Sequence, residues 1–395
     1  MLARRGVEDL AFLRAKFERG APQARRPRRA RAATRQLQEM EQGLTRPHIA
    51  SKKVVSLSEP AVKMTRGPIV ESVHRVDVAV ADNAGRVLFR LGDPGKLTYW
   101  RSSAKPIQAV PVVETGAARR FGFDDQEIAV MCASHSGEDA HIRAVAGILR
   151  KIGLTDDALG CGVHPPLDKD SARRLVACGV GPWQLHCNCS GKHAAMLAIA
   201  VHMGYPVAGY FRPDHPVQRL MLREVSFFAG LPENDVVIGV DGCGVPVFGL
   251  PLSAMARAFA TLASPDRLAD ADAARADAAR RICSAMRTYP HMVAGTGRFT
   301  TALMEVAGDR LVAKSGAEGV YCVGVLGQGL GVAVKVEDGN ARASAPVVVE
   351  VMAQMGVLDA GHLEALAEYH HPHVFNHRGE IVGNVIPDFK LRPGH

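Results

Sequence analysis

The chain has 395 residues, of which 47% are hydrophobic and 22% charged, and its net charge is +8. This composition is typical of a folded globular protein and excludes a disordered or fibrous one. Residues 1–53 carry 14 Lys and Arg against 5 Asp and Glu, a net charge of +9, which leaves −1 for residues 54–395. The positive charge therefore does not indicate a nucleic-acid-binding surface on the rest of the chain.

Residues 1–62 are expected to form a basic, flexible extension. Their Arg-rich run, APQARRPRRARAATR, has no apolar periodicity and contains two prolines. An acidic partner or a nucleic acid for this segment is the alternative, which the near-neutral charge of residues 54–395 does not support. The sequence shows no secretory signal and no uncharged apolar run of about 18 residues, so no membrane partner is expected. Eight cysteines are too few for a disulfide scaffold in this length, and we expect a cytoplasmic protein with free thiols.

Residues 63–395 are expected to form one catalytic domain in which helices and strands alternate. Alternating apolar residues predict a hairpin over 69–91, and glycine-closed apolar patterns predict helices at 105–116, 140–153, 191–204 and 217–230. Residues 127–134 fit a buried strand or a helix. Further along, the pattern predicts a buried strand at 235–240, a helix at 266–287, a loop at 290–304, and two strands at 319–326 and 331–338.

The glycines of GQGLG, residues 327–331, invite a nucleotide-binding interpretation. A dinucleotide fingerprint requires a helix after the glycines, whereas VAVKV has the pattern of a strand. We therefore predict a tight hairpin turn at this place.

The segment RSSAKP, residues 101–106, has the residue types of a serine nucleophile with a lysine base. Residues three apart share one face of a helix, so Lys105 can reach Ser102 rather than Ser103. Pro106 is tolerated only near a helix start, where unpaired N–H groups favour a developing alkoxide. The lysine acts as a base only if burial or a second cation lowers its pKa.

Two later motifs accompany this pair. Ser134-His135-Ser136 lies in a glycine-bounded loop, and Lys314-Ser315-Gly316 precedes a predicted strand. Serine penicillin-recognising enzymes carry S-x-x-K, S-D-N and K-T-G in the same order. The match is loose, since Ser136 stands where that pattern has Asn, and two serine-rich turns with a surface lysine are the structural alternative.

Metal-capable side chains crowd into the run HCNCSGKH, residues 186–193, and Cys243 follows in the loop DGCGVP. Cys189 and Lys192 are three residues apart and would converge on a helix start, where two thiolates and a third ligand suit zinc with an open fourth position. The spacing matches no standard zinc motif, so small buried residues are the alternative. Asp241, at the end of a predicted strand, could pair with a substrate ammonium or cap the loop.

Six blocks of sequence, taken in order, resemble the rhizobial-type, thermolabile L-asparaginase II family, also called class 3. They are RSSAKPIQAVPVVETGAA, MCASHSGEDAHI, CNCSGKHAAMLA, GVDGCGVPVFGLPL, AGTGRFTTALM and AKSGAEGVYCVGV. The resemblance runs from about Pro68 to the C-terminus and leaves the first 60 or so residues without a counterpart. Ala104 and His186-Cys187 are variable places, and neither removes a functional group.

The resemblance implies an α/β (α+β) fold similar to serine β-lactamases and glutaminases: a mixed sheet flanked by helices, with a helical lobe. It also implies a homodimer that hydrolyses L-asparagine to L-aspartate and ammonia. The implied site residues are two Ser-Lys pairs (Ser102 with Lys105, Ser134 with Lys314), a zinc site (Cys189, Lys192, Cys243) and residues around the substrate (Arg101, His193, Asp241).

Several alternatives remain at this stage. A glutaminase, or another serine amidohydrolase of the penicillin-recognising type, fits the same residues, because one methylene changes binding by only ~1–3 kcal/mol. A zinc-dependent hydrolase with structural serines and a non-catalytic binding protein are the hypotheses from other classes. Spacing does not decide which Ser-Lys pair supplies the nucleophile.

Overall fold

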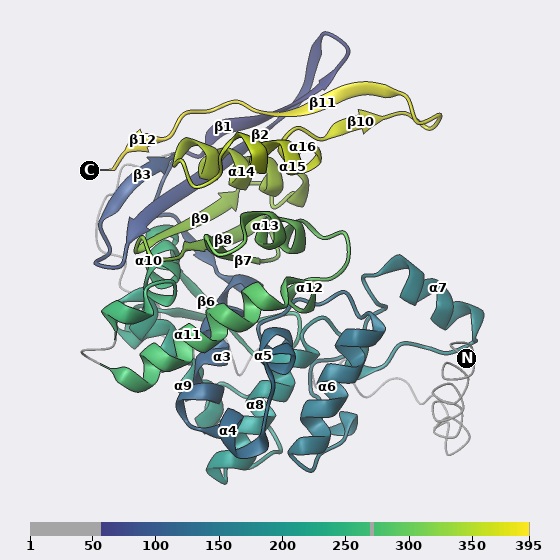
Figure 1. Ribbon diagram of the computed structural model, residues 1–395, viewed down its shortest axis with the longest axis vertical. Helices are drawn as coiled ribbons and strands as arrows, with labels where there is room; N and C mark the ends of the chain where they lie inside the picture. Colours follow the sequence, from purple (N-terminus) through teal and green to yellow (C-terminus); the bar gives the residue numbers. More distant parts are fainter. Residues whose placement is uncertain (1–56, 269–271, 395) are drawn as a thin grey trace, which may run out of the picture. The chain divides into compact units, whose positions relative to one another are not determined.

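The computed structural model describes residues 57–268 and 272–394 (Figure 1). Its two sheets contain the strands β1 Glu59–Arg66, β2 Ile69–Asp82, β3 Val87–Leu91, β4 Leu97–Tyr99, β5 Val237–Val240, β6 Pro246–Pro251, β7 Leu311–Ser315, β8 Val320–Val325, β9 Leu330–Val336, β10 His373–Phe375, β11 Ile381–Pro387 and β12 Arg392–Pro393. The α-helices are α3 Lys105–Glu114, α4 Ala117–Phe121, α5 Asp125–Met131, α6 Asp139–Lys151, α7 Lys169–Ala177, α8 Ser190–Met203, α9 Pro216–Ala229, α10 Leu252–Leu262, α11 Ala273–Thr288, α12 Pro290–Val293, α13 Phe299–Ala307, α14 Ser344–Gln354, α15 Ala360–Ala365 and α16 Ala367–His370. Short 3-10 turns occupy Arg101–Ala104, Asp156–Ala158, Gln184–His186, Glu233–Asp235, Pro265–Arg267 and Ala341–Ala343.

The long strand β2 organises the larger sheet. Its first half is mostly exposed, whereas residues 76–82 are all buried, which is the pattern of a strand covered on both faces. The sheet has the order β10-β11-β1-β2-β9-β8-β7, and β3 and β12 continue from β2. Every pairing in it is antiparallel.

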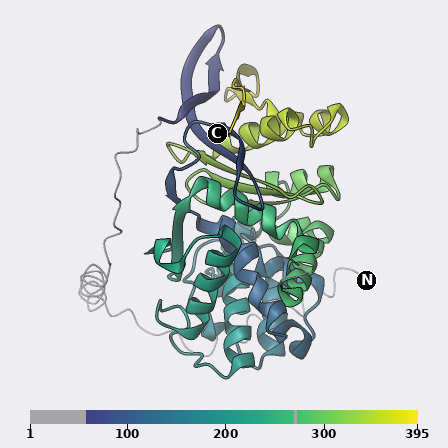
Figure 2. The same cartoon turned by 90° about the vertical axis from the view of Figure 1, so that its left-hand side faces the viewer.

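Helices cover both faces of this sheet. On one side α10 packs against β2, β8 and β9, and on the other α14 packs against β1, β8, β9 and β11. In Figure 2 the yellow-green helices of the C-terminal part and the teal helices of the lobe lie on opposite sides of the green strands. The lobe is built from α3, α5, α6, α8, α9 and α11, which contact one another. The predicted α/β class, with a sheet flanked by helices and a helical lobe, is confirmed. The sheet itself is antiparallel rather than mixed.

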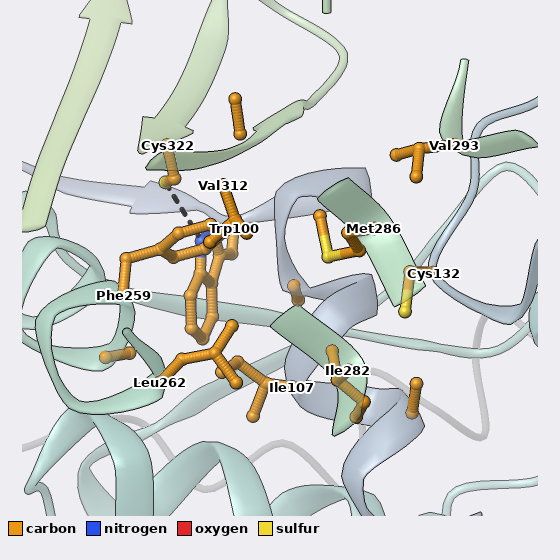
Figure 3. Close-up of a cluster of buried hydrophobic side chains, with 14 of the residues drawn as sticks. Trp100, Ile107, Cys132, Phe259, Leu262, Ile282, Met286, Val293, Val312 and Cys322 are labelled. Carbon is orange, nitrogen blue, oxygen red and sulfur yellow. Dashed lines mark hydrogen bonds between the residues drawn. The ribbon is translucent and has the colours of Figure 1, made fainter. Parts of the chain in front are cut away.

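The small sheet, with the order β4-β6-β5, leads into the centre of the molecule. Trp100 follows β4 directly and is fully buried, edge-on to Phe259 with ring centroids 6.2 Å apart. Its indole N–H donates to the Sγ of Cys322 at 3.3 Å, and Ile107 and Val312 lie around the ring (Figure 3). This core connects the start of α3 to the strands β7 and β8.

Most predicted elements are confirmed. The hairpin over 69–91 is β2 and β3, and the glycines of GQGLG join the antiparallel strands β8 and β9, so no helix follows them. Residues 127–134, which fitted strand or helix, belong largely to α5. The predicted helices in the lobe are α3, α6, α8 and α9.

Three predictions were wrong in part. Residues 290–304 are not a loop, because α12 and α13 occupy much of the segment on either side of a glycine-containing turn. The helix predicted from 266 begins at Ala273. β5 is an edge strand and is only half-buried, since β6 pairs with one side of it alone.

The predicted boundary at residue 62 falls inside β1, which begins at Glu59. Ala61 and Val62 are buried in that strand. The larger part of the predicted basic extension, residues 1–56, lies outside the described residues.

Gly331 is the point of closest approach between α10 and β9. A Cβ there would lie 2.0 Å from the carbonyl oxygen of Ala256 and 2.5 Å from the amide nitrogen of Ala260, both in the helix backbone. We expect Gly331→Ala to lower the free energy of unfolding by about 1–3 kcal/mol, because the helix must shift. Chemical denaturation followed by circular dichroism measures this.

Gly181→Ala is the matched control, since no heavy atom lies within 4 Å of a Cβ at that position. It should change the free energy of unfolding by less than about 0.5 kcal/mol. If the two variants were equally stable, the close packing of α10 on β9 would not require a glycine at position 331.

Candidate active site

The segment that carries Ser102 and Lys105 joins the small sheet to the helical lobe. After β4 it forms the 3-10 turn Arg101–Ala104, and α3 begins at Lys105 with Pro106 in its first turn. Arg101 has a φ of +52°, a left-handed conformation that costs a non-glycine residue about 1–3 kcal/mol. The preceding Trp100 holds this strained turn in place, because its indole is buried and its backbone N–H donates to the carbonyl of Phe248 at 2.8 Å.

Two buried lysines contact one serine hydroxyl. The Nζ of Lys105 lies 3.1 Å from the Oγ of Ser134, and the Nζ of Lys314 lies 2.9 Å from the same oxygen. Lys105 also donates to the carbonyls of Ala133 at 2.7 Å and Asn188 at 3.3 Å. The three side chains come from α3, the loop after α5, and β7, so the tertiary fold brings them together.

Lys314 has the electrostatics of a base. Burial lowers the pKa of its amine well below the ordinary lysine value of 10.5, and the positive charges of Lys105 and Arg298 lower it further. Its side chain is 1% exposed and also donates to the carbonyl of Ser315 at 2.7 Å. A neutral lysine amine can accept a proton from a hydroxyl at hydrogen-bond distance.

Ser102 is half-buried, and across residues 57–268 and 272–394 its hydroxyl has no hydrogen-bond partner. Ser102 and Lys105, which were predicted to pair, form no hydrogen bond in the described residues, and the amine of Lys105 contacts Ser134 instead. Ser103 points elsewhere, as predicted: it is fully buried and donates to the carbonyl of Lys314 at 3.1 Å.

Arg101 and Asp241 are ion-paired beside Ser102. The Nε of Arg101 donates to Oδ1 of Asp241 at 2.9 Å, and the backbone N–H of Gly242 donates to the same oxygen at 2.9 Å. The Asp241 side chain is 9% exposed and directly follows β5. Both functions considered for it, the loop cap and a charged group near the site, are compatible with this position.

Cys189, Lys192 and Cys243 also come together. The Nζ of Lys192 lies 3.1 Å from the Sγ of Cys243, and the two thiols are hydrogen-bonded to each other. Hydrogen bonds from Cys187 and Cys243 hold the pKa of Cys189 well below its ordinary value. Burial lowers the pKa of Lys192. The electrostatic attraction of Cys243, Cys189 and Asp241 for a positive charge is stronger than this effect, so the pKa is raised overall.

The donor set of this cluster suits zinc. Thiolate sulfur and a neutral amine are ligands that zinc accepts, and three protein ligands leave a fourth position open. Within the part of the chain that the structure describes, no group of three or more His, Cys, Asp and Glu is arranged to hold a metal, since the third donor here is a lysine. Lys192 would have to lose its proton to bind the ion.

His193 follows Lys192 in α8 and is fully buried. Its Nδ1 lies 2.6 Å from the hydroxyl of Tyr210, and that hydroxyl accepts the N–H of Gly160 at 2.8 Å. The tyrosine proton is thus directed to Nδ1, which places the imidazole proton on Nε2. Burial lowers the pKa of His193 to about 3, so the ring is neutral, and its Nε2 has no partner among the described residues.

The tertiary structure adds residues that the sequence did not single out. The carbonyls of Ala133 and Asn188 hold Lys105, and Tyr210 orients His193. Backbone carbonyls and a lone tyrosine leave no pattern in a sequence. Arg298 was visible in the block AGTGRFTTALM, but nothing in its spacing connected it with Lys314.

The chain has a weak likeness to several solved structures. Solved structures described as "Crystal Structure Analysis of Mglu in its tris and glutamate form" and "Crystal structure of Mglu in its native form in the presence of 4.3M NaCl" each share 15% identity with it, at TM-scores of 0.33 and 0.34. The matches cover 77% and 78% of this chain, and 64% and 68% of those chains, so this chain spans about two thirds of their length. No curated protein matched.

The sequence profile described as L-asparaginase II matches residues 62–387. These residues include every side chain of the lysine-serine centre and of the thiol cluster, and they make up most of the chain. The protein belongs to the L-asparaginase II family.

Proposed function

We propose that this chain is a rhizobial-type L-asparaginase that hydrolyses L-asparagine to L-aspartate and ammonia through a covalent acyl-enzyme. Family membership supports an amidohydrolase. The observation that supports a Ser-Lys mechanism is the Ser134 hydroxyl, held between Lys105 and Lys314 at 3.1 and 2.9 Å. We call these three residues the Lys105–Ser134–Lys314 row. Two buried ammonium groups this close would repel each other, so one amine is neutral, and a neutral amine is the base that a serine nucleophile needs.

In the proposed reaction Ser102 attacks the side-chain amide carbon of asparagine. Ser102 is half-buried, and its hydroxyl is free of protein partners in the described ranges, so it can meet a substrate. It lies just before α3, where backbone N–H groups can stabilise the oxyanion. Lys105 accepts the proton of Ser102 as the Ser134 hydroxyl relays a proton from Lys105 to the neutral amine of Lys314. The same groups then return a proton to the leaving nitrogen, which departs as ammonia. Water then cleaves the ester and releases aspartate.

A second assignment of the nucleophile is supported by the same contacts. Ser134 is the oxygen that both lysines touch, and a neutral Lys314 could deprotonate it directly. In this version Ser134 attacks and Ser102 assists the leaving group. The two assignments predict different trapped intermediates.

The groups around this centre are complementary to an amino-acid side-chain amide. Asp241 offers a carboxylate for the substrate ammonium, and Arg101 orients that carboxylate. The Nε2 proton of His193 is a buried donor without a partner among the described residues. Each of these would have to meet a substrate atom to offset the cost of its burial.

Zinc is proposed as the cofactor, held by Cys189, Lys192 and Cys243. When bound, the ion would supply a fixed positive charge that orients substrate or the surrounding loops. The Ser-Lys row already provides nucleophile and base, so the metal is not needed to activate water. By its resemblance to the rhizobial type, the protein is further proposed to act as a cytoplasmic homodimer. None of the helices among the described residues is long and apolar enough to cross a membrane.

Ser102→Ala should lower kcat for ammonia release from L-asparagine by about a thousandfold or more, because the proposed nucleophile is removed. Acid-quenched protein should gain an aspartyl group on Ser102 in the wild type and none in the variant, measured by peptide mass spectrometry. Ser253→Ala, at the start of α10, is the control and should retain full activity.

A Ser102→Ala variant that keeps more than about a tenth of the wild-type rate would contradict this assignment. An aspartyl group found on Ser134 would support the second one. Glutamine and a β-lactam assayed beside asparagine test the substrate class, and exclusive turnover of either would overturn the asparaginase proposal.

The pH dependence of kcat/KM should follow the neutral form of Lys314. Activity should fall on acidification, as pH passes down through the lowered pKa of this amine, because the protonated form cannot accept a proton. The plateau should be reached far below the ordinary lysine value of 10.5. Lys314→Arg puts a permanent positive charge in place of the neutral amine and cannot serve as a base, so it should be inactive at every pH.

Lys151→Arg is the matched control for this variant, since Lys151 is a partly exposed lysine paired with Glu127. It should leave the profile unchanged. Near-normal activity of Lys314→Arg with an unchanged acid limb would exclude Lys314 as the base.

Cys243→Ser should reduce bound zinc, measured by elemental mass spectrometry of the purified protein, from about one ion per chain to near zero. The exposed Cys178→Ser is the control and should keep the metal. KM for asparagine should rise in the Cys243 variant while the acylated serine still forms. Complete loss of acylation on chelation would instead support a zinc-dependent hydrolase.

A further inference from the structure

Arg298 is a partly buried cation near the reaction centre that lacks a carboxylate partner. Over residues 57–268 and 272–394 no ion pair involves its guanidinium, and its side-chain contact is a long hydrogen bond from Nη1 to the Oγ of Ser136, 3.5 Å. Its charge contributes to lowering the pKa of Lys314, so the two groups are electrostatically close. The other arginine of the centre, Arg101, is already paired with Asp241.

The turn that leads into Arg298 is fastened to the loop that carries Ser134. The backbone N–H of Ser134 donates to the carbonyl of Val293 at 3.0 Å. The Oγ of Ser136 donates to the carbonyl of Ala294 at 2.9 Å. These bonds join the catalytic loop to the segment between α12 and α13.

Glu138 completes this connection. Its two carboxylate oxygens accept the backbone N–H and the hydroxyl of Thr296, each at 2.8 Å. Gly295 has a φ of +131°, and a Cβ there would lie 2.4 Å from the Oγ of Ser136, so the two loops are in close contact. Arg298 is consequently held at a set position relative to Ser134 by backbone geometry, and its guanidinium remains free to bind.

The charges of the centre favour an anion at this position. Lys105 and Arg298 are both cationic neighbours of Lys314, and Asp241 is held by Arg101 rather than by Arg298. Arginine presents a planar fork of N–H donors that matches a carboxylate with two parallel bonds. A small carboxylate is therefore the ligand that this part of the site is built to take.

We propose that Arg298 binds the α-carboxylate of the substrate, so that the site accepts a free amino acid and rejects the same amide within a peptide. This inference rests on the proposed amidohydrolase function and names the part of the substrate that Arg298 recognises. The amide then lies at the serines and the ammonium lies toward Asp241. A site that binds both the α-carboxylate and the ammonium accepts free asparagine and rejects an asparagine residue within a peptide, which lacks these two charges.

The test compares two substrates that differ only in the group in question. 3-Aminopropanamide is L-asparagine with the α-carboxylate replaced by hydrogen. The assay is run on the pH plateau, where the Lys314 amine is neutral in both proteins. There Arg298→Ala should lower kcat/KM for asparagine by about a hundredfold, mainly through KM, and leave kcat/KM for 3-aminopropanamide unchanged within about twofold. Arg298→Lys should lie between, since it keeps the charge and loses the paired donors. Arg280→Ala, on the exposed face of α11, is the control and should behave as the wild type.

Equal losses on both substrates would overturn the proposal, because a merely structural arginine affects both alike. An unchanged KM for asparagine would overturn it as well. If Arg298→Ala does not fold, the ratio of the two kcat/KM values in Arg298→Lys gives the same comparison.

Product binding separates this inference from the proposed function. Calorimetry of the wild-type protein with L-aspartate and with 3-aminopropanoate, which lacks the α-carboxylate, requires no turnover. Arg298→Ala should weaken aspartate binding by about a hundredfold and leave 3-aminopropanoate binding unchanged. If aspartate binding depends on Arg298 but asparagine is not hydrolysed, the carboxylate site is supported and the proposed reaction is wrong. If asparagine is hydrolysed and aspartate binds equally to both proteins, the reaction is supported and the carboxylate site is wrong.

Discussion

Two buried lysine amines that share one serine oxygen impose the central constraint on this protein. Lys105 and Lys314 approach Ser134 to 3.1 and 2.9 Å, where two ammonium ions would repel each other strongly in a low-dielectric environment. The pKa of Lys314 is lowered accordingly, by burial first and then by its cationic neighbours. A neutral amine beside a hydroxyl is the consequence, and it is also the requirement of serine-based amide hydrolysis.

The surrounding fold consists largely of devices that keep these groups in place. Lys105 is anchored by the carbonyls of Ala133 and Asn188, and Lys314 by its own strand and the carbonyl of Ser315. The core around Trp100 ties the strained turn before α3 to β7 and β8 (Figure 3). A site assembled from three distant segments needs such a rigid frame, because a shift of about 1 Å in one of them costs much of the rate.

The electrostatics of the centre extend beyond the lysine row. The lowered pKa of Cys189 favours a thiolate next to Lys192, and Arg298 contributes a cation near Lys314. His193 stays neutral, with its proton directed to an unpartnered Nε2 by Tyr210. Groups that are so arranged and so incompletely satisfied are typical of a site that completes its contacts with a ligand.

The sequence by itself determined the family, the mixed α/β class, the hairpin of β2 and β3, and the residue types of the chemistry. It did so because hydrophobic periodicity, glycine turns and short motifs are local patterns, which can be interpreted without knowing the tertiary contacts. Only the tertiary structure decided which groups meet. Lys105 was predicted on Ser102 from its spacing of three residues, whereas its amine contacts Ser134 and the carbonyls of Ala133 and Asn188, which come from distant parts of the chain. The same holds for Lys314, Tyr210 and Arg298. Their positions depend on how β7, the helical lobe and the turn before α13 pack together, and long-range packing of this kind is a property of the whole chain that no single stretch of it encodes.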